Sequence, residues 1–347
     1  MGRKGGSDVK DVDGAQVDSP RDVPGLGIDI GTANLVVAGQ LGGNTNIRGM
    51  RNMFLDIDDD KNSVKMLDRM GVRYAKRGKK LSVLGKDAYE LARIFNEEVR
   101  RPMRAGMISS AERDAIPLVR LMVDKLAGQP MVRGEKAFYS VPANPIDSSM
   151  DANYHGAVFS SILTDLGYSP EALPEGHAVG LAELGDSEYT GIAMSFGGGM
   201  TNVGVLYRGI APLTFSVARG GDWVDESVAK VLGTTVPKAI AIKEDDGMDI
   251  GRPANEEQRA VSVYYANLIK YTFENILSMF QRTGSLPDFD SPVDIVCAGG
   301  GSLVKGFIER VKSVYGELEF PLKIREIRVA DDPFTSVARG CLIEALS

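Results

Sequence analysis

The chain has 347 residues, which is more than one typical hydrophobic core holds, and this length predicts two domains. Its composition, with 43% apolar and 25% charged residues, is ordinary for a soluble globular protein. The net charge of −7 argues against nucleic acid as the main partner, because binding a phosphate backbone requires a basic excess.

The sequence pattern contains no signal for a membrane or for export. No apolar run approaches the about 18 residues of a transmembrane helix, and the N-terminus lacks the apolar region of a signal peptide. The two cysteines, Cys297 and Cys341, lie far apart in apolar surroundings, which is typical of free buried thiols in a reducing compartment. We therefore expect a cytoplasmic protein.

Residues 1–23 are rich in Gly, Asp and Ser and have almost no apolar periodicity, which predicts a disordered tail. The alternative is an amphipathic helix that binds a membrane surface. The bulky apolar face that such a helix needs is missing, so peripheral membrane contact has no support in this segment.

The folded part opens with a strand, a short Gly-Thr turn and a second strand over Gly25–Val37. This pattern predicts a β-hairpin with a carboxylate, Asp29, just before the bend. Residues 44–84 are less regular and contain a basic stretch, Arg69–Lys80. A solvated loop face is the simplest interpretation of that stretch, and the alternative is a contact with an acidic partner, a neighbouring subunit or an anionic lipid surface.

Apolar residues spaced three and four apart predict helices in the remainder of the first half. The first helix is expected at Lys86–Arg101, and the second runs from a cap at Ser109 or Ser110 to about Leu126. A strand at Ala137–Val141 follows. The third helix is expected from Asp147 or Ser148 to Gly167.

At the centre of the sequence an apolar run, Ile192–Phe196, stops at consecutive glycines. This pattern is typical of a buried strand that enters a tight turn, where glycines let backbone N–H groups approach an anion. A third such loop follows Val293–Ala298. Two hairpin-type loops and one strand–Gly–helix element predict a nucleotide held between two halves of the molecule, and the related openings at Gly27 and Ile192 indicate a duplicated α/β unit.

The second half also carries strand and helix patterns between its glycine loops. The sequence predicts strands at Val203–Tyr207 and Leu213–Val217, a helix that begins at Gly220–Asp222, a short helix at Pro237–Asp245, and a long helix at Asn255–Arg282. The apolar and aromatic stripe of the long helix predicts core packing and not a ligand site.

In this order and spacing the three loops resemble the phosphate-1, phosphate-2 and adenosine motifs of the actin-like ATPase superfamily. The likeness is greatest to the prokaryotic cell-shape actin MreB and to archaeal actin-like proteins, and it spans about residues 25–345. The segments that carry it are GIDIGTAN at 27–34, RPMRAGMI at 101–108, ARGGD at 218–222 and DPFTSVARG at 332–340.

The resemblance implies an α/β, actin-like fold, with two related domains of mixed sheets and flanking helices around a central nucleotide cleft. Domain I would cover 24–168, with 330–347 returning to it and a small subdomain at about 51–107. Domain II would cover 169–329, with a small subdomain at about 225–270. The implied ligands are ATP or ADP and Mg²⁺.

The resemblance also implies roles for particular residues. Asp29 would hold the metal through water. The amides of the first two loops would bind the phosphates, the third loop would flank the adenine and ribose, and two residues of the short helix would cover base and sugar. The first loop is Gly31, Thr32, Ala33 and Asn34, and the second is Gly197, Gly198, Gly199, Met200 and Thr201. The third loop is Gly299, Gly300, Gly301 and Ser302, and the two residues of the short helix are Lys243 and Glu244. For the last two, an exposed charged helix face is the alternative.

Two positions depart from the family pattern. Ser195 stands where phosphate-2 usually begins with an aspartate, and a hydroxyl can bind a metal-bound water but is a poor general base. The Gln or Glu that orients the attacking water is sought on the helix after Pro145, where His155 is the candidate and Asp151 the reserve. A histidine on the helix surface without such a role is the alternative. We therefore expect slow hydrolysis.

The resemblance implies a cytoskeletal protein that binds ATP, polymerises head to tail with copies of itself, and hydrolyses ATP slowly. Two alternatives remain open at this point. One is a non-polymerising, nucleotide-dependent regulator or adaptor with the same fold, and the other is a small-molecule kinase.

Overall fold

The computed structural model describes residues 21–108, 112, 115–283 and 289–347. The predicted tail lies, for residues 1–20, outside the described residues, as does the helix cap sought at Ser109 or Ser110. The remaining tail residues are ordered. Arg21 is buried and donates to the Ala127 carbonyl at 2.9 Å, and the first strand, β1, already begins at Val23.

Domain I is built on a five-stranded sheet with the order β10-β9-β1-β2-β3. Strands β1, β2 and β3 form an antiparallel meander, and β9 and β10 add in parallel on the other edge of β1. The bounds are Val23–Ile30 for β1, Asn34–Leu41 for β2, Asn44–Arg51 for β3, Lys136–Val141 for β9 and Ser169–Pro174 for β10.

Domain II repeats this topology in its sheet, β13-β12-β11-β14-β15. Strands β11, β12 and β13 are antiparallel, and β14 and β15 continue in parallel. The bounds are Gly191–Phe196, Thr201–Tyr207, Ile210–Val217, Val293–Ala298 and Ile324–Val329. The duplicated α/β fold predicted from the two hairpin openings is therefore confirmed.

The small subdomain of domain I is more regular than predicted. Strands β4 (Phe54–Asp58), β6 (Lys80–Leu84) and β5 (Tyr74–Arg77) form a sheet. Helix α1 (Lys61–Met70) lies beside it, and the Asp60 carboxylate caps that helix by accepting from the amides of Asn62 and Ser63.

Much of the basic stretch Arg69–Lys80 thus lies on strands, so the loop part of the prediction was wrong, whereas most of its charged residues are exposed to solvent as predicted. Two of its charged residues have acidic partners within the subdomain: Arg77 pairs with Asp56 at 2.9 Å and Lys80 with Asp58 at 2.6 Å. The strands are short and their polar faces are exposed, so the apolar alternation was too brief to identify them from sequence.

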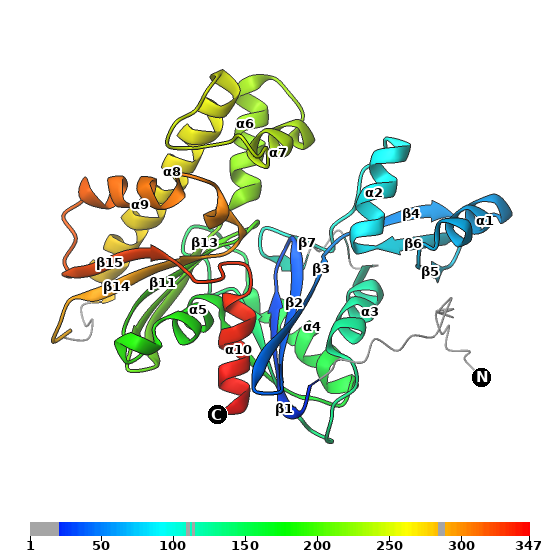
Figure 1. The fold of residues 1–347 in the computed structure, drawn as a ribbon, viewed down its shortest axis with the longest axis horizontal. Coiled ribbons are helices and arrows are strands. Elements are labelled where there is room, and N and C mark those ends of the chain that lie inside the picture. The colour runs from blue at the N-terminus through cyan, green and yellow to red at the C-terminus, as the bar shows by residue number, and fades with distance from the viewer. Residues whose placement is uncertain (1–20, 109–111, 113–114, 284–288) are drawn as a thin grey trace.

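The remaining elements flank the sheets (Figure 1). They are α2 (Gly85–Phe95), β7 (Met103–Arg104), β8 (Met107–Ile108), α3 (Ile116–Ala127), α4 (Ala152–Asp165), α5 (Glu175–Glu183), η2 (Gly185–Ser187), α6 (Gly221–Leu232), α7 (Val236–Lys243), α8 (Glu256–Thr283), η3 (Gly300–Leu303), α9 (Phe307–Gly316) and α10 (Ser336–Leu346). The stripe of α8, including Tyr265 and Ile269, is buried in the core of domain II, as predicted. Cys297 and Cys341 are both buried and free. Within the described ranges, no helix has the length and apolarity needed to cross a bilayer.

Helices α5 and α10 cross between the two sheets, and α10 lies beside β1 (Figure 1). A Cβ on Gly340 of α10 would lie 1.8 Å from the Ala178 carbonyl oxygen of α5. A Cβ on Gly27 of β1 would lie 2.2 Å from the Ala338 carbonyl oxygen. No side chain fits in either place, so the backbones are in direct contact.

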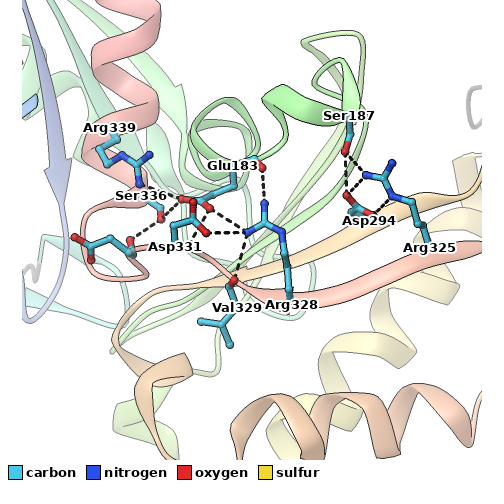
Figure 2. Close-up of polar contacts among 10 residues, drawn as sticks. Glu183, Ser187, Asp294, Arg325, Arg328, Val329, Asp331, Ser336 and Arg339 are labelled. Atoms are coloured by element: carbon cyan, nitrogen blue, oxygen red, sulfur yellow. Dashed lines mark hydrogen bonds and ion pairs between the residues drawn. The ribbon is translucent and has the colours of Figure 1, made fainter. Parts of the chain in front are cut away.

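A buried carboxylate fixes the C-terminal end of α5 (Figure 2). The side chain of Glu183 is 1% exposed and accepts from Arg328 at 3.2 Å and from Arg339 at 3.3 Å. It also accepts from the Asp331 amide at 3.0 Å and the Ser336 hydroxyl at 2.9 Å. One carboxylate therefore ties α5 to β15, to the β15–α10 loop and to α10.

We predict that Glu183→Ala lowers the free energy of unfolding by about 3 kcal/mol, because it leaves buried donors unpaired. This loss of unfolding free energy lies at the lower end of the range for a broken buried ion pair, because the side chains of Arg328 and Arg339 are 26% and 30% exposed and can reach water. Denaturant unfolding measures it. Glu171→Ala, at an exposed glutamate of β10, is the control and should change stability by less than about 0.5 kcal/mol.

Candidate nucleotide cleft

A cavity of about 710 Å³ lies between the two domains, and all three glycine loops reach it. Most of the residues predicted from sequence line it. These are Asp29, Gly31, Thr32, Ala33, Asn34, Ser195, Gly197, Gly198, Gly199, Met200, Lys243, Glu244, Gly299, Gly300 and Gly301. The structure therefore brings together segments from both halves of the chain at one site.

The first two loops are closed turns that face each other. The Gly31 amide donates to the Asn34 carbonyl at 2.9 Å, and the Gly197 amide donates to the Met200 carbonyl at 2.9 Å. A Cβ on Gly198 would lie 3.7 Å from the Ala33 Cβ. The two loops thus approach to van der Waals distance at this point, so an anion beside it would face the backbones of both loops.

The predicted residues Thr201 and Ser302 do not line the cavity. The Thr201 hydroxyl donates to the Arg219 carbonyl at 2.9 Å, and the Ser302 hydroxyl donates to the Gly299 carbonyl at 2.8 Å. Both hydroxyls therefore bond loop carbonyls and do not face the cavity, while the predicted contacts of the Thr201 amide and of Ser302 with a nucleotide stay predictions.

Two carboxylates lie deep in the cleft. Asp29, near the end of β1, accepts from the Ser140 hydroxyl at 3.1 Å. Glu175, the first residue of α5, accepts from the Ser195 hydroxyl at 3.1 Å. Desolvation raises the pKa of Asp29 to about 7. Desolvation, followed by the nearby charge of Asp29, raises the pKa of Glu175 to about 8.

Sequence analysis did not single out Glu175, and it named His155 as the candidate for orienting the attacking water. His155 is 1% exposed, accepts from the Ile108 amide at 3.3 Å and lies against Phe159, with ring centroids 4.9 Å apart. Burial lowers its pKa to about 4. It does not line the cleft, so its catalytic assignment is corrected. The reserve candidate, Asp151, caps α4 by accepting from the Asn153 amide at 2.8 Å.

One local signal pointed to Glu175. It follows Pro174 and opens a helix rich in small residues, and helices of that kind approach a neighbouring backbone closely. A Cβ on Gly176 would lie 2.4 Å from the Gly204 amide nitrogen of β12. This contact fixes the start of α5 against β12, whose partner strand β11 carries Ser195.

The third loop and α7 form the other end of the cleft. Lys243 donates to Asp225 at 2.6 Å, and their side chains are 14% and 4% exposed. Burial raises the pKa of Asp225 to about 6, although Lys243 opposes the shift. An exposed charged face is therefore wrong for Lys243, whereas Glu244 is exposed and lines the cavity.

The lining offers groups for a nucleotide and a divalent cation. Among the described residues, Oδ1 of Asp225 is buried without a hydrogen-bond partner, so a ligand hydroxyl or amine could donate to it. A Cβ on Gly300 would meet nothing within 4 Å, which leaves room beside the third loop. The oxygens of Asp29 and Glu175 suit Mg²⁺, whereas Oδ1 of Asn202 already accepts from the Ala143 amide at 3.1 Å.

The described part of the chain contains no group of three His, Cys, Asp or Glu side chains able to hold a metal by themselves. A cation in this cleft would therefore take part of its ligands from water and phosphate oxygens. The charge of the lining is acidic. Among the described lining residues, seven carboxylates (Asp29, Glu175, Asp222, Asp225, Glu244, Asp245 and Asp246) stand against four cationic side chains (Arg51, Arg101, Lys243 and Lys305).

Known structures share this architecture. The chain is similar to the MamK double helical filament, with a TM-score of 0.72 and 20% identity over 93% of this chain and 98% of that one. It is also similar to MreB5 of Spiroplasma citri bound to AMPPNP, with a TM-score of 0.66 and 14% identity over 93% of this chain and 96% of that one. The actin-like fold is therefore confirmed.

Sequence comparison gives a curated relative and a family. The cell division protein FtsA of Streptococcus pneumoniae serotype 2 (strain D39 / NCTC 7466) is 26% identical over 145 residues, which is 38% of this chain and 32% of FtsA. The resemblance to the actin-like ATPase superfamily is thereby confirmed. The family model described as Volactin matches residues 25–345, and the chain belongs to the Volactin family.

Proposed function

We propose that this chain is an ATP-binding, filament-forming actin-like protein of the cytoplasmic cytoskeleton that hydrolyses ATP slowly. The observation that carries the proposal is the pair of facing glycine loops with Asp29 and Glu175 at the bottom of one interdomain cleft. The similar structures support it, because one is described as a double helical filament and others as bound to AMPPNP or ADP.

The chain's own groups suit phosphoanhydride hydrolysis. Backbone amides of the two loops would hold phosphate oxygens, and Asp29 would hold Mg²⁺ through its water shell. When bound, Mg²⁺ neutralises phosphate charge. Glu175 would orient and deprotonate the attacking water, while the Ser195 hydroxyl fixes the Glu175 carboxylate from 3.1 Å. With Ser195 in place of an aspartate, one anionic group for the metal's water shell is missing, so turnover is slow.

Polymerisation follows if one end of the molecule binds the opposite end of the next copy, since a heterologous contact that does not close makes an open filament. High-speed pelleting with and without Mg·ATP, with electron microscopy of the pellet, tests this proposal. ATP-dependent filaments support it. A protein that binds ATP and stays in the supernatant at high concentration is instead a nucleotide-dependent regulator or adaptor, and phosphate transfer to a small molecule would indicate a kinase.

We predict that Glu175→Gln reduces the steady-state rate of phosphate release by about 10²–10⁴-fold, because the amide cannot accept the proton of the attacking water. Affinity for Mg·AMPPNP at pH 7 should fall far less than the rate, since a pKa of about 8 already leaves much of Glu175 uncharged there and the amide keeps the volume and the hydrogen bond from Ser195. Glu171→Gln, on exposed β10, is the control and should hydrolyse ATP at the wild-type rate. Unchanged phosphate release in Glu175→Gln would show that another group orients the water.

We predict that Mg²⁺ and nucleotide bind more tightly as the pH rises. The raised pKa values, about 7 for Asp29 and about 8 for Glu175, mean that both groups are partly protonated near neutrality. A divalent cation favours the ionised forms, so binding should release protons at about pH 7 and gain affinity up to about pH 8.5.

Calorimetry in buffers of different ionisation enthalpy measures this release. The double variant Asp29→Asn, Glu175→Gln is the reference, because it lacks both titrating groups and keeps the proton equilibria of the nucleotide itself. Equal proton release by wild type and double variant would contradict the assignment of the shifted groups to the binding site.

A further inference from the structure

Two consecutive arginines connect opposite sides of the cleft. Arg100 is fixed to the small subdomain of domain I: its backbone exchanges hydrogen bonds of 2.8 and 2.9 Å with Phe54, and its guanidinium donates to Asp56 at 2.7 Å. Arg101 donates in the other direction, to Asp222 of domain II at 3.1 Å. The small subdomain is thus linked to domain II through two adjacent residues.

The acceptor of Arg101 lies at the phosphate-2 loop. The Asp222 amide donates to the Gly198 carbonyl at 2.8 Å. A Cβ on Gly198 would lie 3.7 Å from Oδ1 of Asp222 and 3.7 Å from the Ala33 Cβ. Because Arg101 bonds that same Oδ1, its guanidinium lies beside the point where the two glycine loops face each other. All four residues line the cavity.

The segment that begins at Arg101 contacts both loops again five residues later. The Gly106 amide donates to the Thr32 hydroxyl at 3.0 Å. A Cβ on Gly199 would lie 2.1 Å from the Gly106 nitrogen, so the two backbones are in direct contact. A displacement of either loop is therefore transmitted to segment 101–106 and, through Arg100, to the small subdomain.

The other cationic groups of the lining contact residues outside the two facing phosphate loops. Lys243 is held by the buried Asp225 at 2.6 Å, the Arg51 guanidinium lies 4.8 Å from the centre of the Tyr89 ring, and Lys305 pairs with Asp249. The Arg101–Asp222 pair is about one-third exposed on both sides, at 30% and 32%. Water screens such a pair, whereas a phosphate offers a guanidinium two parallel, charge-assisted hydrogen bonds.

We propose that Arg101 senses the terminal phosphate, exchanging Asp222 for a γ-phosphate oxygen when the cleft holds ATP and returning to Asp222 with ADP. The inference rests on the proposed ATP binding and adds how the bound nucleotide is read. The exchange places the small subdomain of domain I differently in the ATP and ADP states, because Arg101 directly follows the residue that is anchored in it.

Arg101→Ala tests this when the affinities for Mg·AMPPNP and Mg·ADP are both measured by calorimetry. AMPPNP affinity should fall by about 10–100-fold, as expected for hydrogen bonds to a charged group, and ADP affinity should stay within about threefold. Arg101→Lys should recover part of the AMPPNP affinity that Arg101→Ala loses, since the lysine ammonium keeps the positive charge but lacks the two parallel donors of the guanidinium. Asp222→Asn should raise AMPPNP affinity, because the competing acceptor is weakened.

Arg104→Ala is the matched control, since Arg104 is exposed in the same segment and should leave both affinities unchanged. An equal fall for both nucleotides in Arg101→Ala would show that Arg101 only braces the cleft, and unchanged affinities would remove it from the site. Either result overturns the inference while leaving ATP binding intact. A wild-type protein that binds neither nucleotide would overturn the proposed function itself.

Discussion

The direct contact between the backbones of α5 and α10 is the constraint on which the other features depend. It exists because residue 340 is a glycine whose missing Cβ would lie 1.8 Å from the Ala178 carbonyl oxygen. The same two helices contact β1 at Gly27 and β12 at Gly204, again through backbone. Both sheets are thereby held against one helix pair, and the carboxylates at the end of β1 and the start of α5 enter the same cleft.

Sequence patterns identified the parts of the site that are local. The glycine loops, the two hairpins and α8 each show their character within a short window, as apolar runs that stop at glycines or as a long stripe. The small subdomain was expected at about 51–107, but its three strands were missed because they have only four or five residues and half-polar faces. The β10–α5 unit was missed because Ser169–Pro174 is mostly exposed and contains two prolines.

There is a physical reason why sequence analysis named His155 as the water-orienting candidate and did not single out Glu175. Both lie on helices, and choosing between them required knowing which helix enters the cleft. That is decided by the close approach of Gly176 to β12 and by the burial of α4 through Phe159, neither of which is visible in a helical period. Long-range packing of small residues therefore determined the one catalytic candidate that sequence analysis placed wrongly.

Ser195 also acts as a hydrogen-bond donor to Glu175. Its hydroxyl donates to a carboxylate whose pKa is raised by burial and by the charge of Asp29, so it stabilises the ionised form of Glu175. An aspartate at this position would place a third carboxylate in the same desolvated region. Under the proposed function, the departure from the family pattern would replace a group for the metal's water shell with a hydrogen-bond donor to Glu175, the residue proposed to orient the water.

The acidic lining of the cleft has a consequence for selectivity. Because the pKa values of Asp29 and Glu175 are raised to about 7 and about 8, the lining becomes more negative as the pH rises. Its ionised carboxylates, at most seven against four cationic side chains, then oppose the entry of a free nucleoside triphosphate. Under the proposed function, a divalent cation would then be needed for the nucleotide to enter the cleft as well as for its hydrolysis. Under the proposed function, the protein would discriminate between metal-complexed and metal-free nucleotide before any bond is broken, and dissolved salt, by screening the wall, would relax that discrimination.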